Sequence, residues 1–463
     1  MQQNNNVPLN QLNNRTVIAT RYMQQDNNIL LNTNIQMLRA SPKPYPQNPN
    51  KNILNNGTTS PSAKKKILML CDFYGESLTY QENLLTKYYV KHSYEVVVVC
   101  STFESVFDYV NDRYDAAKPK RQYEAEGAKI IRLPYCLNVL NRLRFFPSLP
   151  TILETERPDL IFVHDIMLNL LDTVTYVRRN RDVKMIMDYH ADYSNSGRNW
   201  LSMKILHGVI RKYILNRARP YLQMIFPVVP ASAKFLNEVY GVPYDDMELL
   251  PLGTDMDLSH EVKALNAGKQ LRYQYGIPIE SIVLLTGGKL SPVKRTEALI
   301  EAFLQLPESD SYLFIVGDAD ALDAEYVNGL HTLVAGNARI HFTGWLPSRA
   351  MLEHLDMADI AAFPASQSVL WQQAIGMGLP LILGEPLALP GGAQDVSYLN
   401  LYENILFAVD GGSLAERLRL AISELLNNPE RRKHMARGAA SVAEELLDWN
   451  RTIYRTVRFT YKT

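Results

Sequence analysis

The stretch LTGGKLSPVKRTEALIEAF, residues 285–303, is the most informative part of this chain. An apolar run leads into two glycines that end at Gly288, and a helical pattern of apolar residues follows. Lys289 and Lys294 lie between the run and the helix. Such a turn can hold a phosphate, because glycine lets the backbone approach, the helix N-terminus offers free N–H groups and lysine adds charge. The alternative is an ordinary strand-to-helix connection with solvated lysines.

The rest of the chain also alternates strands with helices. Nearly continuous apolar runs predict parallel strands that helices cover on both faces. The pattern restarts at Ile282 and runs to about Leu426, which predicts an α/β protein with two Rossmann-like, doubly wound parallel sheets facing a cleft. The strands expected in the first half are KKILMLCDF (65–73), the strand that ends the stretch TYQENLLTKYYVKHSYEVVVVCS (79–101), KIIRLP (129–134), DLIFVHD (159–165), KMIMDYH (184–190) and MIFPVVP (224–230).

Three further stretches follow the glycine turn. They are YLFIVGDAD (312–320), RIHFTGWLPSRAMLEHLDMADIAAFPAS (339–366) and QQAIGMGLPLIL (372–383). In this order, and with the glycine turn, they resemble segments of the retaining glycosyltransferases of family four, which have the GT-B fold. The resemblance covers roughly residues 64–458 and depends on the order and spacing of the pieces together.

The resemblance implies a division of the chain. Residues 1–63 would be an Asn/Gln-rich extension, residues 64–250 an N-terminal Rossmann-like acceptor domain, and residues 251–440 a C-terminal Rossmann-like domain for a nucleotide-sugar donor. Residues 441–463 resemble the terminal helix that crosses back onto the first domain in GT-B proteins.

The resemblance also implies a donor site in the second half. Lys289 stands where the family has an arginine that grips the donor diphosphate, and Lys294 stands where it has a lysine. Gly288 belongs to the same turn, and the backbone of Ser368 and Val369 corresponds to the stretch that meets the diphosphate.

Two glutamates of the family are replaced in this chain. Gln373 occupies the place of the glutamate that binds the ribose hydroxyls, and Ala365 the place of the one near the donor sugar. A neutral amide still hydrogen-bonds a ribose, but more weakly than a carboxylate does. These departures put the identity of the donor, and activity itself, in question.

Candidate acid–base residues follow the predicted strands of the first half. His190 ends one strand, Asp192 comes just after it, and His164 and Asp165 end the neighbouring strand. His190 resembles the family's strand-end histidine, which lies by the donor sugar, so we expect His190 and Asp192 to be catalytic. The alternative is that these histidines cap strands and hydrogen-bond to the backbone.

The turn after the first strand is a weaker candidate. Gly75 resembles the family's glycine-rich loop over the donor phosphates, although the family usually has two adjacent glycines there. Gly75, Glu76 and Tyr80 could face the phosphates or the acceptor. The alternative is a plain helix start in which an acidic residue complements the helix dipole.

The function implied by the resemblance is transfer of a hexose from a nucleotide sugar to a hydroxyl of a glycan, lipid or protein, with retention. We expect no metal and no other cofactor, because Lys289 and Lys294 would neutralise the leaving diphosphate. Two alternatives stay open. One is a non-catalytic GT-B subunit that partners an active glycosyltransferase, and the other is a GT-B epimerase or phosphorylase.

Composition narrows the class of protein. Hydrophobic residues make up 46% and charged residues 21% of the 463 residues, and the formal net charge is zero, so no global charge favours nucleic acid. The three cysteines cannot form a disulfide framework, and we see neither a secretory signal nor an apolar run of about 18 residues. We therefore expect a cytoplasmic protein.

Two segments suggest partners. Between Met1 and Gly57 lie 15 Asn and 7 Gln, which favours disorder, although scattered apolar residues would also allow an arm that docks onto a protein partner. Residues 202–222, SMKILHGVIRKYILNRARPYL, form a basic amphipathic helix pattern. The simpler interpretation is a solvated face over a core stripe, and the alternative is peripheral contact with an anionic membrane or a polyanionic acceptor.

Overall fold

A computed structural model describes residues 64–76, 79–105, 109, 121–139, 142–196, 200–307, 310–319, 321–365, 367–384 and 395–461. The Asn/Gln-rich extension, residues 1–63, lies outside the described residues, so the expectations of disorder or of a docking arm stay predictions.

The first half of the chain forms a seven-stranded sheet in the order β3-β4-β2-β1-β7-β8-β9. All neighbours are parallel except β3 and β4, and β5 and β6 form a separate antiparallel pair. The strands are β1 (Lys66–Leu70), β2 (Glu95–Ser101), β3 (Arg121–Ala125), β4 (Ala128–Leu133), β5 (Leu137–Val139), β6 (Leu143–Phe145), β7 (Leu160–His164), β8 (Lys184–Tyr189) and β9 (Ile225–Pro227).

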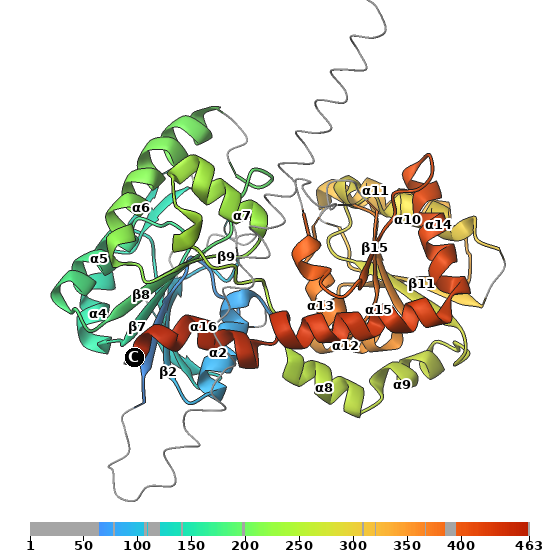
Figure 1. Ribbon diagram of the computed structural model, residues 1–463, viewed down its shortest axis with the longest axis horizontal. Helices are drawn as coiled ribbons and strands as arrows, with labels where there is room; N and C mark the ends of the chain where they lie inside the picture. Colours follow the sequence, from blue (N-terminus) through green and yellow to red (C-terminus); the bar gives the residue numbers. More distant parts are fainter. Residues whose placement is uncertain are drawn as a thin grey trace, which may run out of the picture.

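The second half forms a six-stranded, fully parallel sheet in the order β12-β11-β10-β13-β14-β15. Together the two sheets confirm the predicted α/β class with two Rossmann-like halves (Figure 1). The strands are β10 (Ile282–Gly287), β11 (Ser311–Val316), β12 (Ile340–Gly344), β13 (Ile360–Phe363), β14 (Leu381–Leu383) and β15 (Ile405–Phe407).

Helices cover both faces of the first sheet because its central strands are apolar on both sides. Ile67 and Met69 of β1 pack in the cluster that contains α2 (Gln81–Lys91) and α16 (Trp449–Val457), whereas Leu68 and Leu70 face the opposite cluster. That opposite cluster contains α4 (Leu149–Glu156), α5 (Leu170–Arg179), α6 (Lys212–Ala218) and α7 (Pro230–Phe235), with the π-helical segments η1 (Ser202–Arg211) and η3 (Leu236–Tyr240) next to them.

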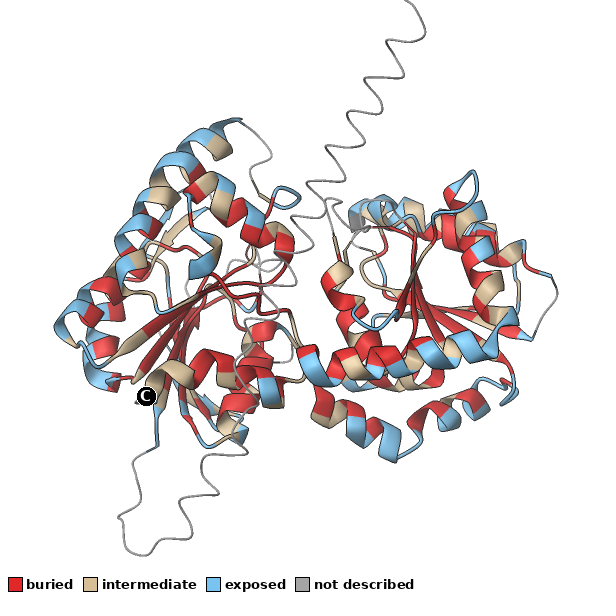
Figure 2. Cartoon of the chain, viewed as in Figure 1, coloured by how far each residue is buried: buried red, intermediate tan, exposed pale blue. Residues whose placement is uncertain are grey.

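The second sheet is covered in the same way, and burial is concentrated in the two sheets (Figure 2). Leu284 of β10 faces one layer of helices and Leu285 the other. The helices are α8 (Met256–Ala264), α9 (Ala267–Gln274), α10 (Thr296–Leu304), α11 (Ala324–Val334), α12 (Ser348–Met357), α13 (Leu370–Gly376), α14 (Leu414–Asn427) and α15 (Pro429–Val442).

Two details differ from the sequence expectations. The predicted strand at 224–230 is shorter than expected, because Pro230 already begins α7. The antiparallel edge strand β3 was not expected, since its side chains are largely exposed and it lacks an apolar run. An antiparallel edge on an otherwise parallel sheet is common.

The C-terminal helix α16 lies against the first half of the chain. Trp449, Ile453 and Val457 are fully buried in the cluster that lies on β1, β2 and α2. Arg455 is buried as well, and its Nε lies 2.5 Å from Oε1 of the buried Glu248, in the segment that leads into the second half. Nη2 of Arg458 lies 2.6 Å from the other carboxylate oxygen. The ion pair therefore fixes the end of the chain to the connection between the two sheets.

We predict that Arg455→Met lowers the free energy of unfolding by about 3 kcal/mol, because it leaves the buried Glu248 with only one of its two partners. Urea unfolding of the full chain measures this loss. Arg451→Met is the control, since Arg451 is an exposed arginine on the same helix. Adding Glu248→Met to Arg455→Met should restore part of the stability, and a single variant that unfolds like the parent would contradict the prediction.

Candidate active site

The carboxyl ends of two neighbouring parallel strands bring three titratable residues together. β7 ends at His164, which pairs in register with Asp188 of β8, and His190 follows directly after β8. Nδ1 of His164 lies 2.7 Å from Oδ2 of Asp188, and Nε2 of His190 lies 3.3 Å from the same oxygen. Asp188 and His164 are buried, and His190 is half-buried. One carboxylate thus joins two imidazole rings at the edge of the sheet.

The charges in this cluster support one another. Burial alone would raise the pKa of Asp188, but the two histidines outweigh it and hold that pKa below its usual range. Burial would lower the pKa of His190, whereas the Asp188 carboxylate raises it to about 9. The pKa of His164 is raised for the same reason, against its own burial. Near neutral pH we therefore expect the His190 ring to be positively charged.

The cluster also has the composition of a metal site. The three side chains each offer a ligand atom within 4.8 Å of the others, and two imidazoles with a carboxylate are common ligands of transition metals. Protons compete with a metal for the same imidazole nitrogens, so any metal binding would weaken at acid pH. The expectation that the protein needs no metal stays a prediction.

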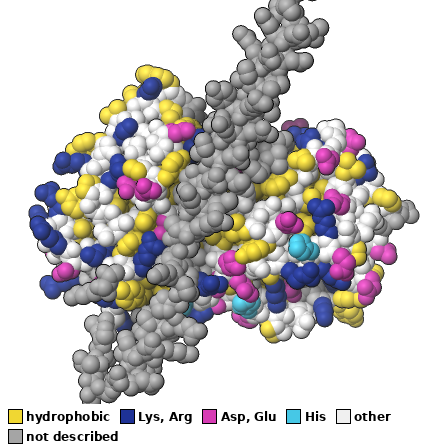
Figure 3. All heavy atoms as spheres, in the orientation of Figure 1, with side chains coloured by type: hydrophobic (Ala, Val, Ile, Leu, Met, Phe, Trp, Pro, Cys, Tyr) yellow, Lys and Arg dark blue, Asp and Glu magenta, His cyan; other side chains and the backbone are white. Residues whose placement is uncertain are grey.

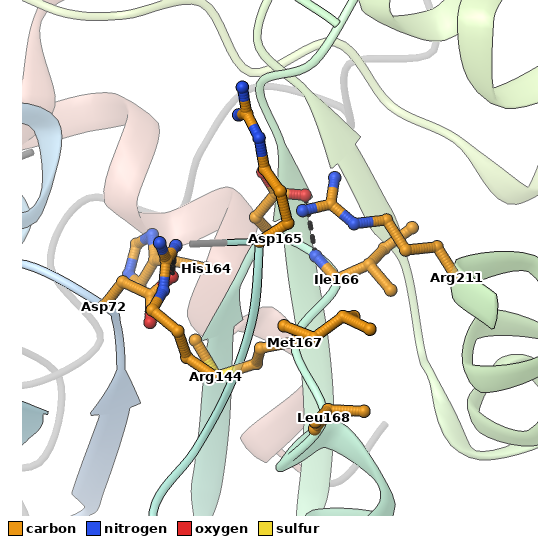
Figure 4. Close-up of a pocket in the computed structure, with 10 residues that line it drawn as sticks. Asp72, Arg144, His164, Asp165, Ile166, Met167, Leu168 and Arg211 are labelled. Carbon is orange, nitrogen blue, oxygen red and sulfur yellow. Dashed lines mark hydrogen bonds and ion pairs between the residues drawn. The ribbon is translucent and has the colours of Figure 1, made fainter. Parts of the chain in front are cut away.

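A cavity opens beside His164 at the same edge of the sheet (Figure 4). Asp165 has a left-handed backbone with φ of 67°, and its Oδ1 accepts a hydrogen bond of 2.7 Å from the backbone N–H of Ile166. Arg144 forms an ion pair with Asp72, and Arg211 extends from the helix that follows the β8 loop toward this strand end. Arg142 also lines the cavity, whose lining is therefore rich in arginine.

The structure uses Asp192 in a turn. Its Oδ1 accepts hydrogen bonds from the backbone N–H of Ser194 at 2.7 Å and of Asn195 at 3.2 Å, and from the hydroxyl of Ser194 at 2.5 Å. These contacts hold the loop after His190, whose carbonyl accepts a hydrogen bond of 3.1 Å from the Asn195 amide. The geometry therefore gives Asp192 a structural role in the loop after His190, and its predicted direct part in chemistry stays a prediction.

The described contacts of Gly75 and Glu76, in the turn after β1, are with residues of the first half of the chain. Glu76 accepts a hydrogen bond from Tyr123 and lies 3.5 Å from the guanidinium of the buried Arg132. The carbonyl of Gly75 accepts a hydrogen bond of 2.9 Å from the Asn83 amide, and Tyr80 stands half-exposed just before α2. Side chains of β3, β4 and α2 therefore hold Gly75 and Glu76 in place.

Three loops of the second half meet at the glycine turn. Gly288 has φ of 119°, and its N–H donates to the carbonyl of Val316 at 2.9 Å. A Cβ on Gly317 would lie only 2.0 Å from the carbonyl oxygen of Gly288, and a Cβ on Gly288 would lie 3.6 Å from Oγ of Ser368. The turns after β10 and β11 and the loop before α13 therefore approach one another through glycine backbone, as a phosphate site requires.

The two lysines that follow the glycine turn have different partners. Nζ of Lys294 donates to the carbonyl of Gln367 at 2.7 Å, and burial lowers the pKa of Lys294. Nζ of Lys289 lies 3.5 Å from a carboxylate oxygen of Asp323. Lys294 thus holds the loop that contains Ser368, whereas Lys289 has an acidic partner on the side of β11.

Val369 and Gln373 line a cavity between the two halves of the chain. Thr79 and Ser348 also line it, and their hydroxyl oxygens lie 3.1 Å apart across the two halves. Oε1 of Gln373 is buried, and among the described residues it has no hydrogen-bond partner. A buried amide oxygen without a partner is costly, and a hydroxyl of a ligand in this cavity would satisfy it, so the ribose contact expected of Gln373 stays a prediction.

Sequence reasoning missed Asp188 and the arginines of the first cavity. Asp188 interrupts an otherwise apolar strand, and a buried carboxylate needs a partner. The acidic residue inside this strand was therefore a signal in the sequence that a charged partner lies nearby. Arg144 and Arg211 come from a two-stranded pair and a helix that are far apart in the sequence, and nothing in the pattern linked them to His164.

Comparison with known proteins agrees with this geometry. The model of Glycosyltransferase Family 4 matches residues 83–258, and the model of Glycosyl transferases group 1 matches residues 269–390. Two Rossmann-like sheets with these matches define the GT-B class of glycosyltransferases. Since the two models together cover more than half of the chain, the chain belongs to the GT-B glycosyltransferases of the family-four type.

Solved structures show the same fold. HepE from Anabaena, in complex with UDP, has a TM-score of 0.60 at 17% identity and covers 85% of this chain and 99% of its own. A glycosyltransferase from Rickettsia africae has a TM-score of 0.61 at 14% identity, with 86% and 98% covered. A D-inositol 3-phosphate glycosyltransferase from Thermomonospora curvata is 25% identical over 238 residues, which are 48% of this chain. The chain spans about half the length of this relative, namely 53%.

We predict that the Asp188 cluster stabilises the fold most at acid to neutral pH. The folded-state pKa of His190 is raised, so its contribution is complete below about pH 6.5 and is lost as the pH rises through about 9. Urea unfolding across this range should show the parent losing stability, and His190→Gln losing less. His434→Gln is the control, because His434 is an exposed histidine in the second half. Parallel pH profiles for the parent and His190→Gln would overturn the prediction.

Proposed function

We propose that this protein transfers a sugar, with retention, from a nucleotide-sugar donor to a hydroxyl of a glycan, lipid or protein acceptor. The observation that carries the proposal is the junction of the Gly288 turn, the Gly317 turn and the Ser368 loop beside the unpartnered Oε1 of Gln373. It combines a close backbone approach, nearby lysines and a buried amide, which are what a nucleoside diphosphate needs. The UDP and UDP-glucose complexes of HepE make UDP the first nucleotide to test.

Each donor-side residue has a proposed part. Lys294 and Lys289 contact the diphosphate, and Lys289 exchanges its contact with Asp323 for a phosphate oxygen. The Gly288 turn and the backbone of Ser368 and Val369 approach the same group, whereas Gln373 accepts a hydrogen bond from a ribose hydroxyl. As the sugar–phosphate bond breaks, negative charge grows on the diphosphate, and the lysines stabilise it without a metal or another cofactor.

The acceptor side is the cavity of the first half. His190, protonated beside Asp188, offers an N–H to the donor sugar or to the diphosphate oxygen that leaves. Arg211 and Arg144 favour an acceptor with a negatively charged group, in keeping with a relative that is named for an inositol phosphate. Asp192 holds the loop that places His190. Glu76 and Tyr80, in the turn after β1 of the same half, face the acceptor.

One observation favours a second function. Ala365 is buried where the family has a glutamate, so no carboxylate stands near the donor sugar at this position. A non-catalytic GT-B subunit that binds a nucleotide and partners an active transferase would have this feature. The purified chain distinguishes the two functions, because a subunit would bind UDP yet neither hydrolyse nor transfer a nucleotide sugar.

We predict that Lys294→Ala and Lys289→Ala each weaken UDP binding by roughly 1.5–3 kcal/mol, since each removes a charge-assisted contact with the diphosphate. Titration calorimetry of the full chain measures this. Lys433→Ala is the control, because Lys433 is an exposed lysine that pairs with Glu430 of its own helix. If the parent binds UDP, GDP, ADP or dTDP and both variants bind it equally well, the proposed phosphate grip is wrong.

We also predict that His190→Ala changes turnover more than binding. Transfer should fall by about 100-fold or more, while UDP affinity stays within about threefold, because the histidine acts on the reacting sugar rather than on the nucleotide. Product formation under saturating donor gives kcat, and calorimetry gives the affinity. His434→Ala serves as the matched control. A modest loss of turnover would make His190 structural.

A further inference from the structure

The helix formed by η1 and α6 has an apolar stripe on its outer face as well as on its inner face. The inner residues His207, Ile214 and Leu215 are buried against the first sheet, as the simpler sequence interpretation expected. The outer face, however, is not simply polar. Its exposed apolar residues, called here the outer stripe, are Trp200 (70% exposed), Leu201 (54%), Ile205 (45%), Val209 (62%) and Tyr213 (58%).

The spacing of the outer stripe makes it one continuous surface. Ile205, Val209 and Tyr213 follow one another at intervals of four residues, and Leu201 precedes them at the same interval. Much of this stretch is π-helical, with i→i+5 hydrogen bonds and wider turns, so residues four to five apart stay on one face. Trp200 and Tyr213 lie at opposite ends of the stripe, and both residue types prefer the headgroup level of a membrane.

The charge around the outer stripe has one sign. Residues 200–222 contain no Asp or Glu, and among their basic residues Lys204 and Arg217 are exposed. Hydrophobic and basic side chains lie side by side over the region of α6 (Figure 3). A second copy of this chain would bring equal positive charges together in a symmetric contact, which opposes association. An anionic lipid surface would bury the apolar side chains of the outer stripe and attract the basic side chains around it.

We propose that the outer stripe docks this protein onto an anionic membrane surface. None of the described helices is long and apolar enough to cross a membrane, so the contact is peripheral. Arg211 of the same helix turns inward and lines the cavity beside His164 (Figure 4). The helix therefore joins the lipid-facing surface to the edge of the arginine-lined cavity, so docking would hold that cavity close to the headgroups.

Flotation of the full chain with lipid vesicles tests the proposal without any donor or acceptor. We expect binding to vesicles that contain phosphatidylglycerol and little binding to pure phosphatidylcholine. Val209→Gln should lower the vesicle partition coefficient by about tenfold, because one buried valine side chain is lost. Lys204→Gln should lower it by about fivefold. Leu265→Gln is the matched control, since Leu265 is an exposed leucine of the second half.

Every outcome is decisive once thermal melting shows that the variants are folded. Loss of binding in Val209→Gln and Lys204→Gln, with Leu265→Gln unchanged, supports the proposal. It is overturned if the parent ignores anionic vesicles, if both variants bind as the parent does, or if Val209→Gln instead dissociates a dimer seen by size exclusion. Because no nucleotide is present, these results are independent of the proposed transfer, and UDP titration reports on that separately.

Discussion

Covering a parallel sheet with helices on both faces leaves only its strand ends for chemistry. In both halves of this protein the central strands are buried on each side, so a functional side chain within them would have no access to a ligand. The candidate site follows from that constraint. His164 and His190 stand at the ends of β7 and β8, and the glycine turn stands at the end of β10. The same constraint explains why Asp188, one residue inside β8, is fully buried and contacts the two histidines at the strand ends.

The sequence was sufficient where the physical requirement is local. A continuous apolar run must be a buried strand, and a positive φ at a close backbone approach requires glycine, so β1, β7, β8 and the Gly288 turn could be predicted from the residues alone. The sequence was insufficient where a contact depends on which strands are neighbours and on their register. That His164 and His190 share one oxygen of Asp188 depends on which strands are neighbours, and no pattern along the chain states this. Asp192 shows the same limit, because its turn contacts come from loop geometry.

The described contacts between the two halves have different characters. Two ion pairs, Lys87–Asp255 and Lys91–Asp257, join α2 to the start of α8. The Arg455–Glu248 pair is buried and fixes the C-terminal helix at the connection, whereas the contact between Thr79 and Ser348 joins two hydroxyls across the cavity that contains Gln373. Breaking a buried ion pair is costly, whereas a single hydroxyl contact is weak. A nucleotide that enters the cavity could displace the hydroxyl contact, while the ion pairs of α2 with Asp255 and Asp257 would still join the two halves.

The departures from the family pattern point in one direction. Where the family has an arginine and two glutamates, this chain has Lys289, Ala365 and Gln373, so the donor side loses two negative charges and keeps its positive ones. Asp323 returns one negative charge by its contact with Lys289. A neutral amide holds a ribose less firmly than a carboxylate, so more of the donor's binding free energy must come from the diphosphate. Diphosphate contacts are shared by all nucleoside diphosphates, whereas ribose and base contacts separate them. In the proposed donor site, the diphosphate contacts would therefore supply the larger share of donor binding, and discrimination between nucleotides would fall to other residues of the cavity between the two halves.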